Sequence, residues 1–201
     1  LKGSRKICES YAGRIVEFCS FDGYFAGLTR DAVGSERYRV EVRTEGGHSF
    51  GCFGNRNAIA YLSSMIDTLY ELKPPVSKTR TTYNVGTIKG GTSVNTIAQQ
   101  AEMLYEYRSD SAADLDFMRR HFNAVVEAYR TKGITVQVEL LGQRPCSGDV
   151  DPEKLEALSR RIGGAVAAYS GVTPAVMAGS TDCNIPLSLG IPAVCVGAVD
   201  G

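Results

Sequence analysis

The period of hydrophobic residues changes along the chain, and these changes predict its elements. Over 37–43, Tyr38, Val40 and Val42 alternate with charged residues, which is typical of a strand with one exposed face. Further strands are expected at 81–88, 101–108 and 134–140, and helically spaced apolar residues predict helices at 55–72 and 111–133. The order β-α-β-β-α-β predicts a ferredoxin-like unit, an antiparallel four-stranded sheet with two helices on one face.

The segments that flank this unit follow an α/β pattern. Residues 14–23 and 191–196 are mostly apolar runs, as in strands buried on both faces of a sheet. Residues 24–36 are expected to be a connecting segment. Asp151-Pro152 predicts the start of one helix and Ser180-Thr181-Asp182 the start of another. The predicted domains are an α/β domain made of 1–34 and 147–201, incomplete at its C-terminal end, and an inserted α+β ferredoxin-like lid at 35–146.

Composition narrows the classes of protein. Lysine plus arginine number 22, as do aspartate plus glutamate, so the chain lacks the basic surface expected for nucleic-acid or anionic-membrane partners. No apolar stretch approaches the ~20 residues of a membrane span. The six cysteines form no C-x-x-C pair, and several lie in apolar runs, so they are expected to be buried free thiols in a reducing compartment. A globular cytoplasmic protein is the expectation, with neither nucleic acid nor membrane as a partner.

Two Gly-Gly pairs each precede a residue that could bind a ligand. His48 follows Gly46-Gly47, where a rigidly held imidazole can offer a proton or an N–H near neutral pH. Two residues without Cβ also indicate that something approaches the backbone closely. Asn95 follows Gly90-Gly91, and ordinary turn chemistry is the alternative for both His48 and Asn95. His121, the other histidine, is expected on the surface of its helix.

Three further positions are candidates by residue type and location. Asp22 ends an expected α/β strand, where ligands bind and where a carboxylate suits zinc, although a turn role is the alternative. Arg108 projects opposite Tyr105 and Tyr107, and could clamp a carboxylate or belong to a solvated face. Residues 179–182, Gly-Ser-Thr-Asp, could bind an anion at a helix N-terminus or simply cap that helix.

Three stretches taken together resemble one known family. They are Arg37 to Ile59 with its Gly-Gly-His-Ser motif, Gly90 to Arg108 with Asn95, and Gly179 to Val194 with its Gly-Ser-Thr-Asp start. In this order they are similar to the zinc-dependent exopeptidases and deacylases that include peptidase T, aminoacylase, acetylornithine deacetylase and succinyl-diaminopimelate desuccinylase. The resemblance covers essentially the whole chain, and it implies a lid, or dimerisation, domain inserted into part of a catalytic domain.

For the lid, the resemblance implies three functional residues and a homodimer. His48 would be the lid histidine that reaches the partner's active site and stabilises the developing oxyanion. Asn95 and Arg108 would hold a peptide or N-acyl amino acid substrate and its free carboxylate. Glu106, two residues before Arg108, stands where the family more often has Asp. The seam of the dimer would be either the strand at 38–42 or the helix from Asn55.

For the catalytic part, the resemblance implies that Ser180 and Thr181 line the substrate pocket and that Asp22 ligates one of two zinc ions. The reaction would be attack on a peptide or amide carbonyl by a water that bridges both metals. The family's His-x-Asp motif, bridging Asp, Glu-Glu pair and final His have no counterpart in this sequence. Leu1 would fall just after the Glu-Glu pair and Gly201 just before the final His. The chain is therefore expected to be a fragment of a hydrolase that is inactive alone.

Three functions stay open at this stage. The first is a di-zinc aminopeptidase, dipeptidase or tripeptidase. The second is an N-acyl amino acid deacylase of the same family. The third, a non-catalytic dimerisation or ligand-binding module, would not need His48, but such a module would not need the trailing α/β sequence either.

Overall fold

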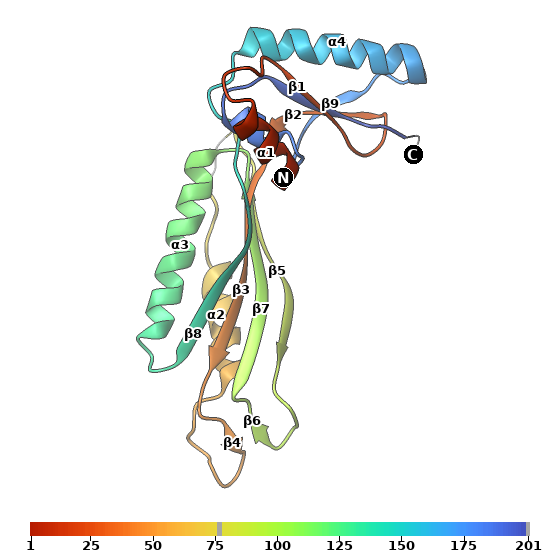
Figure 1. The fold of residues 1–201 in the computed structure, drawn as a ribbon. Helices are drawn as coiled ribbons and strands as arrows, with labels where there is room; N and C mark the ends of the chain where they lie inside the picture. The colour runs from red at the N-terminus through yellow and green to blue at the C-terminus, as the bar shows by residue number, and fades with distance from the viewer. Residues whose placement is uncertain (76–77, 200–201) are drawn as a thin grey trace. The chain divides into compact units, whose positions relative to one another are not determined.

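The computed structural model describes residues 1–75 and 78–199. The chain forms two compact units. Unit 1 combines Leu1–Ser35, Ser109–Ala112 and the chain from Arg144 onward, and unit 2 combines Glu36–Arg108 and Ala113–Gln143. Each unit has its own main sheet (Figure 1). Within the described stretches, no helix has both the length and the hydrophobicity needed to cross a bilayer.

Unit 1 is built around a mixed four-stranded sheet. Its elements are α1 (Lys2–Ser10), β1 (Phe18–Phe21), β2 (Gly27–Ala32), α4 (Pro152–Ser170), β9 (Ala175–Gly179), α5 (Asn184–Ser188) and β10 (Ala193–Val196). The strand order is β1-β10-β2-β9, in which β1 is parallel to β10, β10 antiparallel to β2, and β2 parallel to β9. Leu28 and Val194 pack with Leu158 of α4, which lies along this sheet (Figure 1).

Two predictions for unit 1 were wrong. The connecting segment expected at 24–36 contains β2, because strand pairing on both sides overrides the polar composition of Thr29, Arg30 and Asp31. Strand β1 lies at the edge of the sheet, so its residues are half-buried or exposed rather than buried on both faces. Strand β9 was not predicted, and it lies at the other edge with four of its five residues exposed.

The two expected helices of this region differ in outcome. Helix α4 begins where predicted: the Asp151 carboxylate accepts from two backbone N–H groups of the first turn, Pro152 takes the first position, and Gly171 ends the helix in the left-handed conformation. Helix α5 starts later than predicted. Ser180 and Thr181 consequently lie in the turn between β9 and α5 instead of beginning a helix.

Unit 2 has the predicted ferredoxin-like architecture. Its elements are β3 (Gly34–Arg43), β4 (Gly47–His48), α2 (Ala58–Tyr70), β5 (Thr81–Gly90), β6 (Thr96–Ile97), β7 (Gln100–Ser109), α3 (Ala112–Arg130) and β8 (Thr135–Arg144). The main sheet has the order β5-β7-β3-β8, and β4 pairs with β6 in a separate small sheet. The strands β4 and β6 were not predicted. The mixed fold class, with a ferredoxin-like domain inserted into an α/β unit, is confirmed.

The alternating pattern of the central strands separates an apolar face from a charged face. On the helix side, Tyr38 and Tyr105 both stack on Phe122 of α3, with ring centroids 4.5 and 5.4 Å apart. On the outer side, charged residues pair across strands, as Nε of Arg37 does with Glu106 at 3.1 Å. The core of unit 2 therefore lies between its main sheet and its helices.

The strand order also corrects one expectation about a dimer. Strand β3 lies between β7 and β8, so both of its edges are already hydrogen-bonded. It cannot pair edge to edge with a second copy, so a seam at 38–42 made by strand pairing is ruled out. The free edges of the main sheet are β5 and β8.

Candidate functional site

Residues 46–55 and 92–97 form a tip at one end of unit 2. His48 of β4 lies opposite Thr96 of β6, and the backbone N–H of Ser49 donates to the carbonyl oxygen of Asn95 at 2.9 Å. The structure thus brings together His48 and Asn95, which the sequence placed after two separate Gly-Gly pairs.

Gly46 and Gly47 allow the chain to enter this tip. Gly46 has φ of 62° and Gly47 of 128°, values that L side chains rarely adopt. A Cβ on Gly46 would lie 2.8 Å from the carbonyl oxygen of Ile97, and one on Gly47 would lie 2.8 Å from the Cβ of Cys52. The backbone is approached closely, as the sequence indicated. The atoms that approach it are the chain's own, so the glycines shape the turn rather than admit a ligand.

The imidazole of His48 is held through one of its two nitrogens. Its Nδ1 accepts from the backbone N–H groups of Phe50 and Gly51, both at 3.3 Å. A neutral imidazole that accepts at Nδ1 carries its proton on Nε2. Nε2 makes no hydrogen bond to any residue that the structure describes, and the side chain is exposed. His48 therefore presents an N–H donor to the outside.

The surface of the tip is uncharged and partly apolar. Residues 46–55 and 92–97 contain no Asp, Glu, Lys or Arg. The flanking charges, Glu45 and Arg56, are paired with each other, with Nε of Arg56 2.8 Å from Oε1 of Glu45. Phe50 and Phe53, by contrast, are each 90% exposed. Sequence reasoning missed both rings, although two aromatic residues in a glycine-rich turn are a signal for an exposed contact surface.

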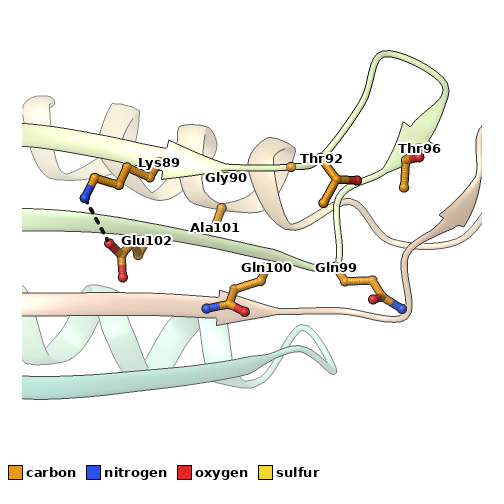
Figure 2. A pocket seen from close by; sticks show the side chains of 9 residues that line it. Lys89, Gly90, Thr92, Thr96, Gln99, Gln100, Ala101 and Glu102 are labelled. Carbon is orange, nitrogen blue, oxygen red and sulfur yellow. Dashed lines mark ion pairs between the residues drawn. The ribbon is translucent and has the colours of Figure 1, made fainter.

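A cleft of about 430 Å³ lies beside the tip (Figure 2). It is lined by Lys89, Gly90, Gly91, Thr92, Thr96, Gln99, Gln100, Ala101 and Glu102. Because directly paired residues of antiparallel strands project to the same face, the His48 side chain emerges on the face of Thr96. Lys89 and Glu102 are paired at 4.0 Å and give the cleft no unopposed charge.

Arg108 is not part of the tip. It lies eight residues after Gln100 on β7, about 27 Å away at the usual rise of a strand. Its Nε and Nη2 contact the two oxygens of Glu106 at 3.0 and 3.1 Å. These hydrogen bonds, together with the nearby Arg37, hold the pKa of Glu106 below its usual range. Within one copy, a small substrate cannot contact Arg108 and His48 together.

Asp22 follows β1 directly, as predicted, and its side chain is exposed. Its backbone N–H donates to the carbonyl oxygen of Val196 at 2.9 Å, which continues the pairing of β1 with β10. Among the residues that the structure describes, no three His, Cys, Asp or Glu side chains come together in a group that could hold a metal ion. Asp22 therefore offers a single carboxylate, and these residues do not fit a zinc site by themselves.

Ser180 and Thr181 make hydrogen bonds within unit 1. Nη1 of Arg144 donates to the carbonyl oxygen and to Oγ of Ser180, at 2.9 and 3.1 Å. Oγ1 of Thr181 accepts from the backbone N–H of Cys183 at 3.1 Å. Helix α5 has only five residues, so the expected anion site at its N-terminus has too short a helix behind it. Arg144 was not anticipated as a contact of Ser180.

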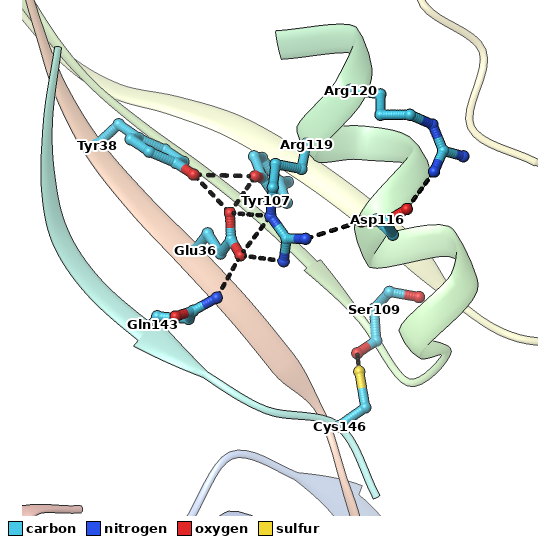
Figure 3. A network of polar contacts seen from close by, with 9 residues as sticks. All are labelled: Glu36, Tyr38, Tyr107, Ser109, Asp116, Arg119, Arg120, Gln143 and Cys146. Atoms are coloured by element: carbon cyan, nitrogen blue, oxygen red, sulfur yellow. Dashed lines mark hydrogen bonds and ion pairs between the residues drawn. The ribbon is translucent and has the colours of Figure 1, made fainter. Parts of the chain in front are cut away.

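Unit 2 also holds a buried polar cluster that sequence reasoning missed, termed the Glu36 network (Figure 3). The buried carboxylate of Glu36 accepts from Tyr38, Tyr107, Arg119 and Gln143. Burial raises the pKa of Glu36, but these donors outweigh burial and leave the pKa below its usual range. Burial and the bond to Glu36 raise the pKa of Tyr38 to about 12. Every partner of this carboxylate is internal, so the network is structural.

The second histidine differs from its expectation. His121 is half-buried in α3 rather than on its surface, and its Nε2 is buried without a partner among the described residues. Burial lowers the pKa of His121. It lies outside the tip and provides a natural contrast to His48.

The chain thus has a ferredoxin-like unit inserted into an α/β unit, and the inserted unit carries a histidine on a glycine-containing tip. This is the architecture of proteins that carry a lid domain. Residues 32–133, about half of the chain, match the family of peptidase dimerisation domains, and the chain belongs to that family. No curated protein matches the chain.

Solved structures share the fold over nearly the whole chain. An aminohydrolase from methicillin-resistant Staphylococcus aureus aligns with a TM-score of 0.71 at 15% identity and covers 98% of this chain and 54% of that one. Aminobenzoyl-glutamate utilization protein from Klebsiella pneumoniae aligns with a TM-score of 0.67 at 18% identity, over 90% of this chain and 49% of that one. Aminopeptidase PepT from Bacillus cereus aligns with a TM-score of 0.64 at 21% identity, over 90% of this chain and 48% of that one. The chain spans about half the length of these structures, and at such identities the likeness concerns the fold.

Proposed function

We propose that this chain forms the lid and part of the catalytic domain of a metal-dependent hydrolase of peptide or amide bonds. Membership of the peptidase dimerisation family supports an enzyme of this kind. The structures that share the fold include an aminopeptidase and an aminohydrolase, which supports the same class. An exopeptidase that acts on short peptides is the form of this activity that we favour.

The observation that carries the proposal is the Nε2–H of His48, which has no hydrogen-bond partner among the described residues. Two backbone N–H groups fix the imidazole through Nδ1, so this donor is oriented before any ligand arrives. A preorganised donor stabilises charge that develops on a carbonyl oxygen during attack on an amide. His48 would supply this hydrogen bond, and Asn95 on the same tip would orient the substrate.

The position of Arg108 supports a site shared between two copies. His48 and Asn95 lie at one end of β7 and Arg108 near the other. A substrate whose carbonyl meets His48 and whose carboxylate meets Arg108 would therefore need His48 from one copy and Arg108 from the other. A guanidinium suits such a carboxylate, although Glu106 must share it. The activity would accordingly require a homodimer.

The edge formed by β5 and α2 is the surface that we propose for this dimer. Helix α2 carries one charged residue, Asp67, in its 13 residues, and β5 carries only Lys89 in its 10. Helix α3 carries six charged residues in its 19. A free strand edge beside a charge-poor helix can pair with its own copy at low desolvation cost.

Metal chemistry would need ligands beyond those described. Asp22 suits a divalent cation, but a zinc site takes about four ligands, and the described residues bring no such set together. We therefore expect the 201-residue chain alone to show no metal-dependent hydrolysis. Two zinc ions, as the resemblance implies, would be completed by other residues of a longer hydrolase. Restoration of hydrolysis by adding zinc to this chain alone would contradict this expectation.

The activity is tested in the full-length hydrolase with the two histidines as a matched pair. His48→Ala should lower kcat by about 10²–10³-fold, the usual loss for one oxyanion donor, without dissociating the dimer. His121→Ala should leave kcat within about threefold, because His121 does not reach the tip. Equal effects of the two variants would overturn the role of His48. Comparing hydrolysis of peptides with a free amino terminus and of N-acyl amino acids distinguishes a peptidase from a deacylase. If neither kind of substrate is hydrolysed, a non-catalytic module is favoured.

The dimer surface is tested with two equally exposed aliphatic residues on opposite edge strands. Ile88 of β5 is 52% exposed and Leu140 of β8 is 51% exposed. Ile88→Lys should produce monomers by analytical ultracentrifugation, because it places charge in the seam, whereas Leu140→Lys should remain dimeric. The reverse pattern would place the seam on β8, and a dimer in both variants would overturn a strand-edge seam.

A further inference from the structure

We propose that Phe50 and Phe53 form an apolar subsite that recognises the group carrying the scissile carbonyl. The hydrolase would accordingly favour substrates in which that group is an apolar side chain or acyl chain. This inference rests on the proposed function, because it takes His48 as the donor to the carbonyl oxygen.

The two rings are exposed although their burial would be favourable. Each is 90% exposed, whereas burying a phenylalanine side chain is worth about 2–3 kcal/mol. They therefore contribute little to the packing of unit 2. Val94, which precedes Asn95 on the other loop of the tip, is also exposed. Single exposed apolar residues are common, but three on one small tip indicate a contact surface.

The turn that carries the rings is tied to the imidazole. The backbone N–H of Phe50 donates to Nδ1 of His48, and the N–H of Cys52 donates to the carbonyl oxygen of His48 at 2.9 Å. The Nδ2 of Asn55 closes the turn on the carbonyl oxygen of Gly46 at 2.7 Å. The turn that fixes the imidazole through Nδ1 is therefore the same turn that carries both rings, and a substrate carbonyl that accepts from Nε2 would meet a surface to which they belong.

The charge pattern decides which substituent fits. The tip has no Asp, Glu, Lys or Arg, and the flanking Glu45 and Arg56 neutralise each other. A charged substituent placed among the rings would lose water and gain no partner, whereas an apolar one would bury surface on both sides. The rings would also keep water from the N–H donor, which strengthens its effect on developing charge. The occupant to which the structure points is an apolar group.

The test compares two substrates in the full-length hydrolase. Leu-Gly and Asp-Gly serve for a peptidase, and N-hexanoylglycine and N-succinylglycine serve for a deacylase. The double variant Phe50→Ala, Phe53→Ala should lose about 10-fold or more in kcat/KM on the apolar member of the pair and less than about threefold on the acidic member. Replacing both rings with Leu should restore most of the preference. Tyr169→Ala removes an aromatic side chain that is 85% exposed on α4, and it should change neither value.

Each other outcome has a defined meaning. An equal loss on both substrates would show that the rings only hold the tip, and would overturn the subsite. A wild-type preference for the acidic substrate would overturn it as well. If the wild type hydrolyses neither pair, the proposed function itself fails, which is distinct from a working enzyme whose selectivity ignores the rings.

Discussion

The Glu36 network and the tip treat hydrogen-bonding groups in opposite ways. In the network, a buried carboxylate is surrounded by four donor side chains of unit 2. At the tip, Nδ1 of the exposed His48 accepts two hydrogen bonds from its own turn, Nε2 has no partner among the described residues, and the same turn carries two exposed rings. A saturated buried group stabilises the fold and has no capacity left for a ligand, whereas an exposed free donor adds little stability and can bind. Stability and function are therefore expected to respond to different residues of the same unit.

The largest expected effect comes from disrupting the Glu36 network. Glu36→Ala removes the buried acceptor that Arg119 and two tyrosine hydroxyls share, and it should lower the free energy of unfolding by about 3–5 kcal/mol. Urea unfolding followed by circular dichroism measures this loss. Glu106→Ala, which removes two ion pairs on the outer face, is the control and should cost about 1 kcal/mol or less. Equal losses in the two variants would contradict the assignment.

Acid should act on the same residue. The donors around Glu36 keep its pKa below the ordinary value despite burial, so the folded carboxyl binds a proton less readily than the unfolded one. Its contribution is fully present above the unfolded pKa of about 4.3, and it is lost as pH falls through the lower folded value. Urea midpoints measured from pH 7 down to pH 3 should therefore fall more steeply for the wild type than for Glu36→Gln. Parallel curves would argue against the lowered pKa.

A smaller effect is expected from strain at the tip. Gly46→Ala places a Cβ 2.8 Å from the carbonyl oxygen of Ile97 at φ of 62°, and it should cost about 1–3 kcal/mol. It should also lower kcat of the full-length hydrolase, because it shifts His48. Gly142→Ala, where a Cβ would meet nothing within 4 Å, is the control and should be nearly neutral in thermal unfolding. A Gly46→Ala protein as stable as this control would show that the tip adapts.

The cap of α2 should give an effect of about 1 kcal/mol. Oδ1 of Asn57 accepts from the backbone N–H groups of Ile59 and Ala60, at 2.9 and 3.4 Å, and Asn57→Ala removes both bonds. Asn123→Ala, an exposed change within α3, should be close to neutral. Differential scanning calorimetry compares the two, and a larger loss at Asn123 would contradict this account of the cap.

The smallest effect sharpens the functional side of the comparison. His48→Ala should change the free energy of unfolding by less than about 0.5 kcal/mol, because the side chain is exposed and its two hydrogen bonds are long, at 3.3 Å. The same urea series measures it. A loss above about 1 kcal/mol would mean that His48 holds the turn together, and its proposed loss of activity would then have a structural cause.

The ferredoxin-like unit was predictable because its six main elements have long, clean periods. The alternation over 37–43 fits only a strand, and the spacing of Leu115, Met118 and Phe122 fits only a helix. The structure buries the apolar residues of both patterns. Glu36 was within reach of the same reasoning. It has the parity of Tyr38, Val40 and Val42, so extending the alternation by one residue places a carboxylate on the buried side.

Other features could not be read from local pattern. The middle of β2 is polar, and β9 is mostly exposed, so only their pairing in the sheet of unit 1 defines them as strands. Each candidate residue could be identified only singly, and each also fitted an ordinary turn, capping or surface role. Contact between the Asn95 and His48 segments depends on β4 pairing with β6 across 48 residues of chain, which no short-range signal reports. Separation of Arg108 from them follows from the length of β7.

The bond between Glu36 and Gln143 has a consequence for how such chains arise. These are the first and last residues of unit 2, and Nε2 of Gln143 lies 2.7 Å from Oε1 of Glu36. A module whose two ends touch can interrupt a host chain at a single point, with little loop-closure entropy for the host. It can be gained, exchanged or shortened at its far end without rebuilding the surrounding sheet. An inserted module of this kind can vary at its tip while its point of insertion stays fixed.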